Sequence, residues 1–335
     1  MNDMRAELGK TEDGSMIMDA LRGRNLNDDD QAVAGLQMQL IDVSSDSKTG
    51  LPYEYNPTVL KQFFAARPFT VATRVLQLAT VGGGFAVQVL LDVLLKRSSP
   101  DLEIQRAAQL RNLLTSLGPF YIKVGQALSI RPDILSPRSM VELQKLCDKV
   151  PSYDSKIAFE TVQSELGQSV HEVFSEITPE PVAAASLGQV YKAKLRETGE
   201  SVAVKVQRPG VLETVSLDLY LAREVGLLLR KLPFERQPLD AVALLDEFAY
   251  RFYQELDYNL ECENGLRMER EMKVLPMVKV PSNFPKYTAR RVHVAEWIDG
   301  EKLSQSTADD VSALVNLGVI TYLTQLLESG FFHAE

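Results

Sequence analysis

A lysine in an apolar run is the residue of this chain best suited to chemistry. Lys205 ends the sequence Val202-Ala203-Val204-Lys205, whose alternation predicts a strand with Ala203 and Lys205 on one face. A cation in such a strand either reaches solvent or binds an anion, and in protein kinases this lysine contacts the nucleotide phosphates. The four residues alone leave two alternatives, a phosphate-binding lysine and an edge-strand lysine that faces water.

An alanine-rich segment lies just upstream, at residues 181–190 (PVAAASLGQV). Small side chains let a backbone approach phosphates closely and present N–H donors to them. Alanine tolerates fewer backbone angles than glycine, so such a loop is stiffer than a glycine-rich one. A phosphate loop and the start of an alanine-rich helix both fit the pattern. The candidate phosphate-binding residues are Ala183, Ala184, Ala185, Ser186, Gly188 and Gln189.

Three carboxylates follow in the sequence QELDYNLE, within a long helix predicted over residues 240–273. Asp257 and Glu261 are four residues apart and share a helix face, whereas Glu255 points elsewhere. One face can meet Lys205 and the other a second cation. The alternative is a solvated acidic surface.

Lys123 stands among apolar and aromatic residues in the sequence FYIKVGQ, which makes it a candidate buried cation in need of a carboxylate partner. Gly125 and Gln126 lie within the same helical pattern and indicate close packing at that point.

Metal and nucleic-acid chemistry have little support in the composition. Cys147 and Cys262 lack metal-ligand spacing and are predicted to be reduced thiols, and His171 and His293 are isolated, as surface or internally bonded histidines usually are. The net charge of −9 argues against a nucleic-acid partner, because phosphate-backbone binding needs a basic face.

The elements around these residues predict an α+β fold. Residues 188–195 and 201–206 alternate as the two strands of a hairpin, and two more strands are predicted at 278–280 and 291–296. A small antiparallel sheet with a long helix packed on it is typical of the amino-terminal lobe of a protein-kinase-like fold. Helices are predicted over 101–117, 136–149, 155–166, 209–232, 240–273 and 308–329.

Two regions precede these helices. Residues 1–55 are polar and predicted to be largely disordered, and residues 56–100 are predicted to be helical, with a mostly apolar stretch over 75–95. Gln77, Gln88 and Asp92 interrupt that stretch, which favours a buried or membrane-surface helix over a helix that spans a bilayer.

In their order along the chain, these motifs resemble those of the UbiB/aarF-domain family of atypical kinases. The sequence Lys123-Val124-Gly125-Gln126 matches the family's KxGQ motif, Ala183–Val190 its alanine-rich loop, Val202–Lys205 its invariant-lysine strand, and Glu255-Leu256-Asp257 its ExD motif. The resemblance covers residues 101–335. The sequences of residues 117–137 and 296–303 are most similar to those of plastid and cyanobacterial members. The resemblance divides the chain into a helical extension over 101–180 and an atypical-kinase amino-terminal lobe over 181–335.

The resemblance implies roles for the residues that match. Lys205 would contact the phosphates of ATP and Glu261 would be its helix partner, while Lys123 and Gln126 would fold over the active site with Glu255 and Asp257. Such a cover blocks a protein substrate, so ATPase or small-molecule kinase activity in isoprenoid-quinone or prenyl-lipid metabolism is expected. The implied partners are a nucleotide and an isoprenoid lipid or membrane surface. The implied location is a plastid, at thylakoids or plastoglobules, with mitochondrial and bacterial membranes as alternatives.

The sequence departs from the family at its last residues. The family continues after His333-Ala334 with a catalytic loop, whereas here Glu335 takes the position of the catalytic aspartate. We therefore expect the second lobe to be essentially missing and no catalytic or metal-binding set to be complete in this chain. Mg²⁺ would be a cofactor only if the missing part were present. The expectation is an inactive, truncated kinase; the alternative is a non-catalytic short form that binds a lipid or a partner.

Overall fold

A computed structural model describes residues 45–97, 99–147, 150–231, 240–301, 303, 306 and 310–333. Its contacts divide the chain into two units, residues 1–53 and 54–335. In the first unit, residues 45–52 form a turn in which the Asp46 carboxylate accepts hydrogen bonds from the Thr49 N–H at 2.9 Å and from its hydroxyl at 2.7 Å. Most of the segment predicted to be disordered, residues 1–44, lies outside the described residues.

The second unit begins with five helices, each of which has a proline in its first turn. Proline suits this position because its fixed φ angle is helical and its missing N–H would have no partner there. Asn56, Ser99 and Ser136 cap three of these helices by accepting hydrogen bonds from backbone N–H groups of the first turn. The helices are α4 (Pro57–Ala65), α5 (Pro68–Leu94), α6 (Pro100–Leu117), α7 (Pro119–Leu128) and α8 (Pro137–Gln144).

These bounds confirm that most of residues 56–100, predicted to be helical, and the helix predicted over 101–117 are helical. The helix predicted over 136–149 is shorter, because the chain tightens into a 3₁₀ turn at Lys145–Cys147, and residues 148–149 lie outside the described part. Helices α6, α7 and α8 share a small core, in which Leu114, Ile122, Leu143 and Leu146 are buried.

Helix α5 has an unusual distribution of side chains: its two buried residues, Arg74 and Asp92, are charged. Arg74 forms an ion pair with Asp218 at 2.7 Å, and Asp92 forms one with Arg106 of α6 at 2.6 Å. The large apolar side chains of α5 are exposed instead, among them Phe69, Leu76, Val87, Leu90, Val93 and Leu94. The polar side of this helix therefore faces the protein.

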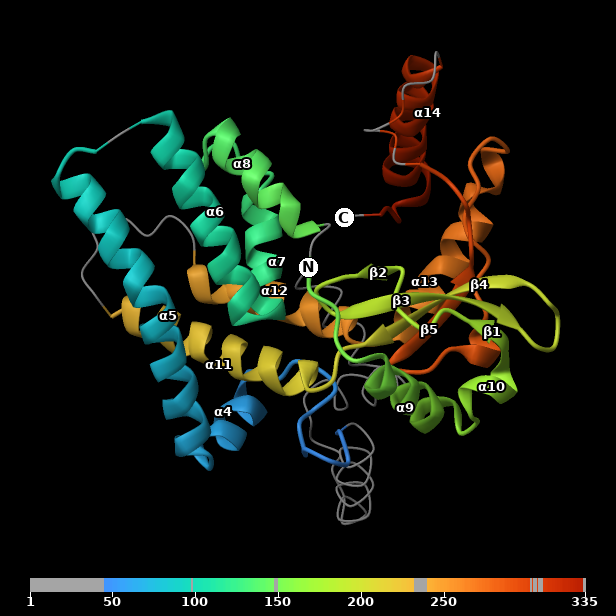
Figure 1. Cartoon of the computed structure of the whole chain (residues 1–335), viewed down its shortest axis with the longest axis horizontal. Helices are drawn as coiled ribbons and strands as arrows, with labels where there is room; N and C mark the ends of the chain where they lie inside the picture. Colours follow the sequence, from blue (N-terminus) through green and yellow to red (C-terminus); the bar gives the residue numbers. More distant parts are fainter. Residues whose placement is uncertain are drawn as a thin grey trace, which may run out of the picture. The chain divides into compact units, whose positions relative to one another are not determined.

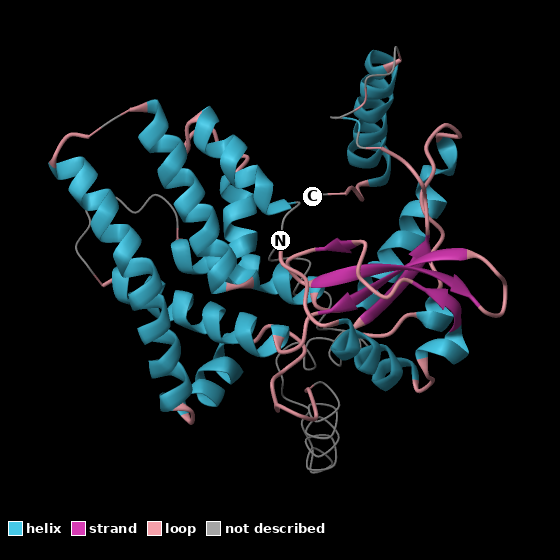
Figure 2. Ribbon diagram, in the orientation of Figure 1, coloured by secondary structure: helices cyan, strands magenta, loops and turns pink. Residues whose placement is uncertain are grey.

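The strands form one antiparallel sheet in the order β1-β3-β4-β5, with β2 paired to β3, and Figure 2 shows them as a single twisted layer. The predicted hairpin is confirmed, and in it Val190 of β3 pairs with Lys205 of β4. The strands are β1 (Phe174–Ile177), β2 (Ala183–Ala184), β3 (Gly188–Leu195), β4 (Ser201–Gln207) and β5 (Val292–Glu296).

One face of the sheet is covered by α9 (Ser155–Leu166) and α10 (Val170–Val173), as Figure 1 shows. The inward-facing Val202, Val204 and Val206 of β4 are fully buried in this core. Helix α9 has the predicted bounds and ends at Gly167, whose φ of 68° is left-handed. Residues 155–177 therefore belong with the sheet rather than with the helices that precede them.

After β4 the chain forms α11 (Val211–Leu229), which packs on α4, α7 and α12 (Ala241–Glu255), and then α13 (Tyr258–Glu271), which packs on β5. The single helix predicted over 240–273 is therefore wrong. Asp257 has an extended backbone (φ −110°, ψ 100°) and caps α13, so the helix axis changes between Glu255 and Tyr258. A 3₁₀ turn at Met272–Val274 follows.

The strand predicted over 278–280 is also wrong, since these residues lie in irregular backbone. Pro281 and the 3₁₀ turn Pro285–Tyr287 limit pairing with β5 to a short contact, in which Phe284 N–H donates to the Val294 carbonyl at 3.0 Å.

The last helix predicted from the sequence, over 308–329, is present as α14 (Val311–Thr324) and a π-helical turn, Gln325–Ser329. Most of its large apolar side chains are exposed, from 40% at Leu314 to 75% at Leu327. Gln325 is buried and donates to the Met272 sulfur at 3.7 Å, so the turn is anchored at the end of α13.

Candidate functional site

Lys205 lies on the face of the sheet opposite the valine core. Its Nζ donates to both carboxylate oxygens of Glu261 on α13, at 2.8 and 2.7 Å. The Lys205 side chain is 27% exposed and that of Glu261 40% exposed, so the pair is partly open to solvent. An amine fixed in this way can accept an anionic ligand without losing its carboxylate partner.

Tyr258, the first residue of α13, packs its ring against the Lys205 ammonium group. Its ring centroid lies 4.7 Å from the Lys205 Nζ, which is a cation–π distance. Burial raises the pKa of the Tyr258 hydroxyl well above its usual value. Among the described residues, that hydroxyl has no hydrogen-bond partner.

The break between α12 and α13 separates the two carboxylates of the ExD motif. Glu255, the last residue of α12, forms an ion pair with Lys123 of α7 at 2.8 Å. Asp257 accepts a hydrogen bond from the Asn259 N–H at 3.0 Å and pairs with Arg290 at 2.7 Å. The predicted shared face of Asp257 and Glu261 is therefore wrong, because Asp257 is a cap and not a helical residue.

Gly125 explains why α7 can approach its neighbours. A Cβ atom at this position would lie 2.5 Å from the Leu146 side chain and 2.7 Å from that of Leu114. Gln126 donates to the Leu146 carbonyl at 3.3 Å. The glycine and the glutamine of the KxGQ motif thus contact α6 and the turn after α8, and Lys123 is the member that reaches the ExD motif.

The alanine-rich segment is a tight connection between β2 and β3, not the start of a helix. Ala183 and Ala184 pair with Val190 and Gln189, and Ala185 N–H donates to the Gly188 carbonyl at 2.8 Å. Gly188 has no room for a side chain, because a Cβ atom would lie 2.5 Å from the Val206 carbonyl oxygen.

The prediction that Gln189 contacts a nucleotide needs correction. Its side chain is fully buried on the face away from Lys205. There it accepts a hydrogen bond from Tyr153 N–H at 3.0 Å and donates to the Tyr153 carbonyl at 3.1 Å. Gln189 therefore ties the sheet to the segment before α9. Strand alternation is the physical reason, because Gln189 and Val190 point to opposite faces of the sheet.

Sequence reasoning missed His293. It pairs with Lys205 across the β4–β5 ladder, and its Nδ1 lies 3.6 Å from the Glu261 carboxylate. Its Nε2 lies 2.7 Å from the Asn283 side-chain oxygen. Burial lowers the pKa of His293; Glu261 opposes this shift and Lys205 reinforces it. Only a predicted register between β4 and β5 could have placed His293 next to Lys205 from the sequence.

Arg208, one residue beyond β4, was also missed. Its guanidinium donates to the Ala185 carbonyl at 3.1 Å and to the Pro151 carbonyl. Burial lowers the pKa of this arginine. The sequence signal was a cation three residues after Lys205, which the alternation alone places on the opposite side.

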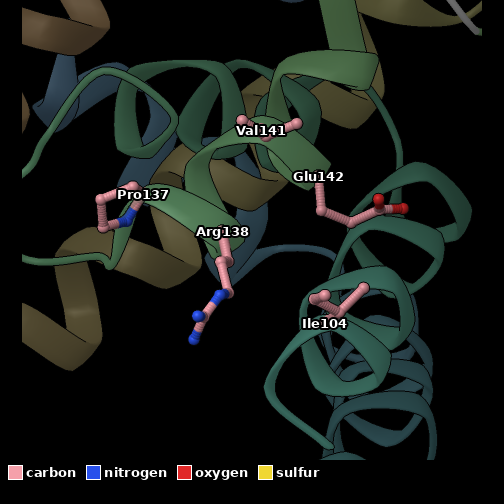
Figure 3. A pocket seen from close by; sticks show the side chains of 5 residues that line it. All are labelled: Ile104, Pro137, Arg138, Val141 and Glu142. Atoms are coloured by element: carbon pink, nitrogen blue, oxygen red, sulfur yellow. The ribbon is translucent and has the colours of Figure 1, made fainter. Parts of the chain in front are cut away.

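Among the described residues, no group of three acidic, histidine or cysteine side chains comes together that could hold a metal ion. Glu335, which we expected at the position of the catalytic aspartate, lies outside the described part. A hollow of about 340 Å³ is lined by residues of α6 and α8, namely Ile104, Pro137, Arg138, Val141 and Glu142, whose side chains Figure 3 shows. None of the predicted site residues lines it.

Comparisons with known proteins agree with the motifs. The ABC1 atypical kinase-like domain matches residues 145–335. An uncharacterized protein of Synechocystis is 42% identical over 84% of this chain and 42% of its own length. The Arabidopsis thaliana protein named ACTIVITY OF BC1 COMPLEX KINASE 3, chloroplastic, is 41% identical over 94% of this chain and 43% of its own length.

A solved Mycobacterium tuberculosis protein in complex with erythromycin is 32% identical over 54% of this chain and 45% of its own, with a TM-score of 0.40. The chain spans less than half the length of the two curated relatives described above.

Proposed function

Since the chain belongs to the family of ABC1 atypical kinase-like domains, as its resemblance to UbiB/aarF proteins indicated, we propose that it binds ATP through Lys205. The observation that carries this proposal is the Lys205–Glu261 ion pair on the partly open face of the sheet. Glu261 fixes the lysine side chain, so less rotamer entropy is lost when the ammonium contacts a phosphate.

The neighbouring residues on this face suit the rest of a nucleotide. Val190, Ala203 and Ala295 lie beside one another by strand register, are partly exposed, and have small or medium side chains against which a base can pack. At the tip of the alanine-rich connection, the Ser186 and Leu187 N–H groups donate to no acceptor within the described part of the chain. N–H groups of this kind bind phosphate oxygens.

In the whole protein we propose a phosphoryl-transfer or ATPase role in isoprenoid-quinone or prenyl-lipid metabolism, within a plastid and at thylakoids or plastoglobules. The chloroplastic names of the Arabidopsis relatives support the plastid, and the Lys123–Glu255 pair supports a covered site that excludes protein substrates. Transfer itself needs a metal and a catalytic base, and no cluster of three metal-ligating side chains lies among the described residues.

The single tryptophan provides a direct test of nucleotide binding. Trp297 follows β5, with its ring 4.7 Å from the Nζ of Lys192, a neighbour of Ala203 in the β3–β4 ladder. Titration with a fluorescent ATP analogue should quench Trp297 emission by energy transfer. We expect Lys205→Ala to weaken binding by about tenfold or more, or about 1.4 kcal/mol, while replacement of the exposed Lys194 of β3 by alanine leaves it unchanged. Equal affinity of Lys205→Ala and the unmodified chain would refute the assignment.

A second function, binding to a membrane surface, is favoured by α5. By length and hydropathy, two helices among the described residues are long and apolar enough to cross a membrane, Pro68–Leu94 and Val311–Ser329, which is weak support by itself. On the inner side of α5, Arg74 forms an ion pair with α11 and Asp92 forms one with α6. A helix fastened in this way lies along a bilayer rather than through it, with its exposed apolar side in the interface.

Vesicle sedimentation tests this second proposal. With vesicles of phosphatidylcholine and phosphatidylglycerol, we expect the chain to co-sediment, and Leu76→Glu with Leu90→Glu to reduce the bound fraction severalfold. Met277→Glu is the control, because Met277 is 82% exposed and is not part of α5. The same loss in the control, or none in the double variant, would exclude α5 as the membrane-binding surface.

A further inference from the structure

Arg208 joins the alanine-rich connection to the end of β4. Its Nε donates to the Ala185 carbonyl at 3.1 Å, and its own backbone N–H donates to the Leu187 carbonyl at 2.8 Å. The guanidinium also donates to the Pro151 carbonyl and lies 5.6 Å from the Tyr153 ring centroid. The arginine thus contacts carbonyls on both sides of Ser186.

The charge of Arg208 has no acidic counterpart among the residues that the structure describes. The groups that influence its pKa besides burial are the hydroxyls of Tyr153 and Tyr258, and neither is a carboxylate. Backbone carbonyls satisfy guanidinium donors but do not neutralise the cation. A partly buried cation without a counter-ion creates a positive potential around the connection.

The contact with Ala185 also determines where one N–H group points. The peptide unit between Ala185 and Ser186 is planar and trans, so its C=O and N–H bonds point in opposite directions. Since the Ala185 carbonyl points toward Arg208, the Ser186 N–H points away from it. A charge-assisted hydrogen bond to the carbonyl polarises the peptide and strengthens the N–H as a donor.

We propose that Arg208 is a positioning residue for nucleotide phosphates: it orients the Ala185–Ser186 peptide so that the Ser186 N–H faces them, and it contributes an uncompensated positive charge behind that peptide. The inference rests on the proposed binding of ATP and adds to it the discrimination of phosphorylated ligands from adenosine. Arg208 reaches the ligand only through the peptide, so its effect must scale with the ligand's charge.

The test measures how adenosine, ADP and ATP compete with the fluorescent ATP analogue, by the recovery of Trp297 emission, in the 335-residue chain and in Arg208→Gln and Arg208→Lys. Glutamine retains an uncharged N–H donor for a backbone carbonyl, and lysine retains the charge without the planar fork. We expect Arg208→Gln to weaken ADP and ATP binding about tenfold and to leave adenosine unchanged, with the difference shrinking as NaCl is raised. Arg208→Lys should be intermediate.

The matched control is Arg196→Gln. Arg196 also donates from Nε to a backbone carbonyl, that of His171 at 2.9 Å, but at the other end of β3. Its replacement should leave all three affinities unchanged.

The outcomes separate the two proposals. If Lys205→Ala weakens ATP binding while Arg208→Gln does not, or while it weakens adenosine binding equally, the inference is overturned and the proposed function stands. If the unmodified chain binds no nucleotide, both are overturned.

A second measurement does not depend on the folding of a variant. In the unmodified ¹⁵N-labelled chain, the Ser186 amide resonance should shift on addition of ADP and not on addition of adenosine. An unchanged Ser186 resonance at saturating ADP would overturn the inference.

Discussion

Arg74 and Asp218 form a two-point ion pair between α5 and α11, with Nε–Oδ1 and Nη2–Oδ2 distances of 2.7 Å. Asp218 is fully buried, and Arg74 also donates to the Leu117 carbonyl at the end of α6. One charged side chain on α5 therefore connects three helices. It also explains how a helix with an apolar outer side stays attached to the protein.

Breaking this pair should strongly destabilise the fold. Arg74→Leu leaves the Asp218 carboxylate buried without a counter-ion, and we expect the free energy of unfolding to fall by about 3–5 kcal/mol in urea titrations. The double variant Arg74→Leu/Asp218→Leu should recover much of this loss, because no unpaired charge remains. A single variant as stable as the unmodified chain would show that the pair does not anchor α5.

Two glycines should respond to alanine in opposite directions. Gly188→Ala places a Cβ atom 2.5 Å from the Val206 carbonyl oxygen and 2.8 Å from the Tyr258 hydroxyl, so we expect a loss of about 1–3 kcal/mol. Gly82→Ala in α5 meets no atom within 4 Å and should stabilise the chain by about 0.5–1 kcal/mol, because alanine favours the helix. Thermal unfolding measures both, and equal shifts for the two variants would contradict this account.

The Lys123–Glu255 ion pair should be detectable by charge exchange. Lys123→Glu places two carboxylates in contact between α7 and α12, and we expect it to cost about 1 kcal/mol in this partly exposed setting. The exchanged pair, Lys123→Glu with Glu255→Lys, should recover part of that cost. If the loss of unfolding free energy in the double variant equals the sum of the losses in the two single variants, the two side chains do not interact.

His293 should make stability depend on pH. Because burial lowers its pKa below the usual 6.5, the unfolded chain binds the proton first as pH falls. The contribution of His293 is therefore fully present above pH 6.5 and is lost as pH decreases through the lowered folded-state pKa. Glu261 and Lys205 face the ring, and the neutral Asn283 bonds its Nε2.

The measurement is the urea midpoint at about pH 7.5 and about pH 5.5, on either side of the ordinary histidine pKa. We expect the urea midpoint of His293→Gln to fall less from the higher to the lower pH than that of the unmodified chain, since glutamine does not titrate. His171→Gln is the control, because His171 is exposed. An unchanged drop in His293→Gln would assign the pH dependence to other groups.

Local pattern was sufficient for the elements themselves. The strand Gly188–Leu195 and the helix Ser155–Leu166 have the predicted bounds, and Lys205 and Ala203 lie on the face that strand alternation assigned to them. These features depend on neighbours two to four residues away, which the sequence displays directly. The motif order was likewise enough to place the chain in its family.

Contacts between distant residues decided the rest. The turn at Asp257 exists because its side chain caps α13 and meets Arg290, and the inward orientation of Arg74 depends on Asp218, 144 positions away. His293 joins Lys205 and Glu261 only because β5 pairs with β4, and Arg208 reaches Ala185 only because β2, β3 and β4 are adjacent. The apolar residues of 75–95 suggested a helix, but tertiary ion pairs determined which of its sides faces outward, because a buried charge requires a partner that periodicity cannot identify.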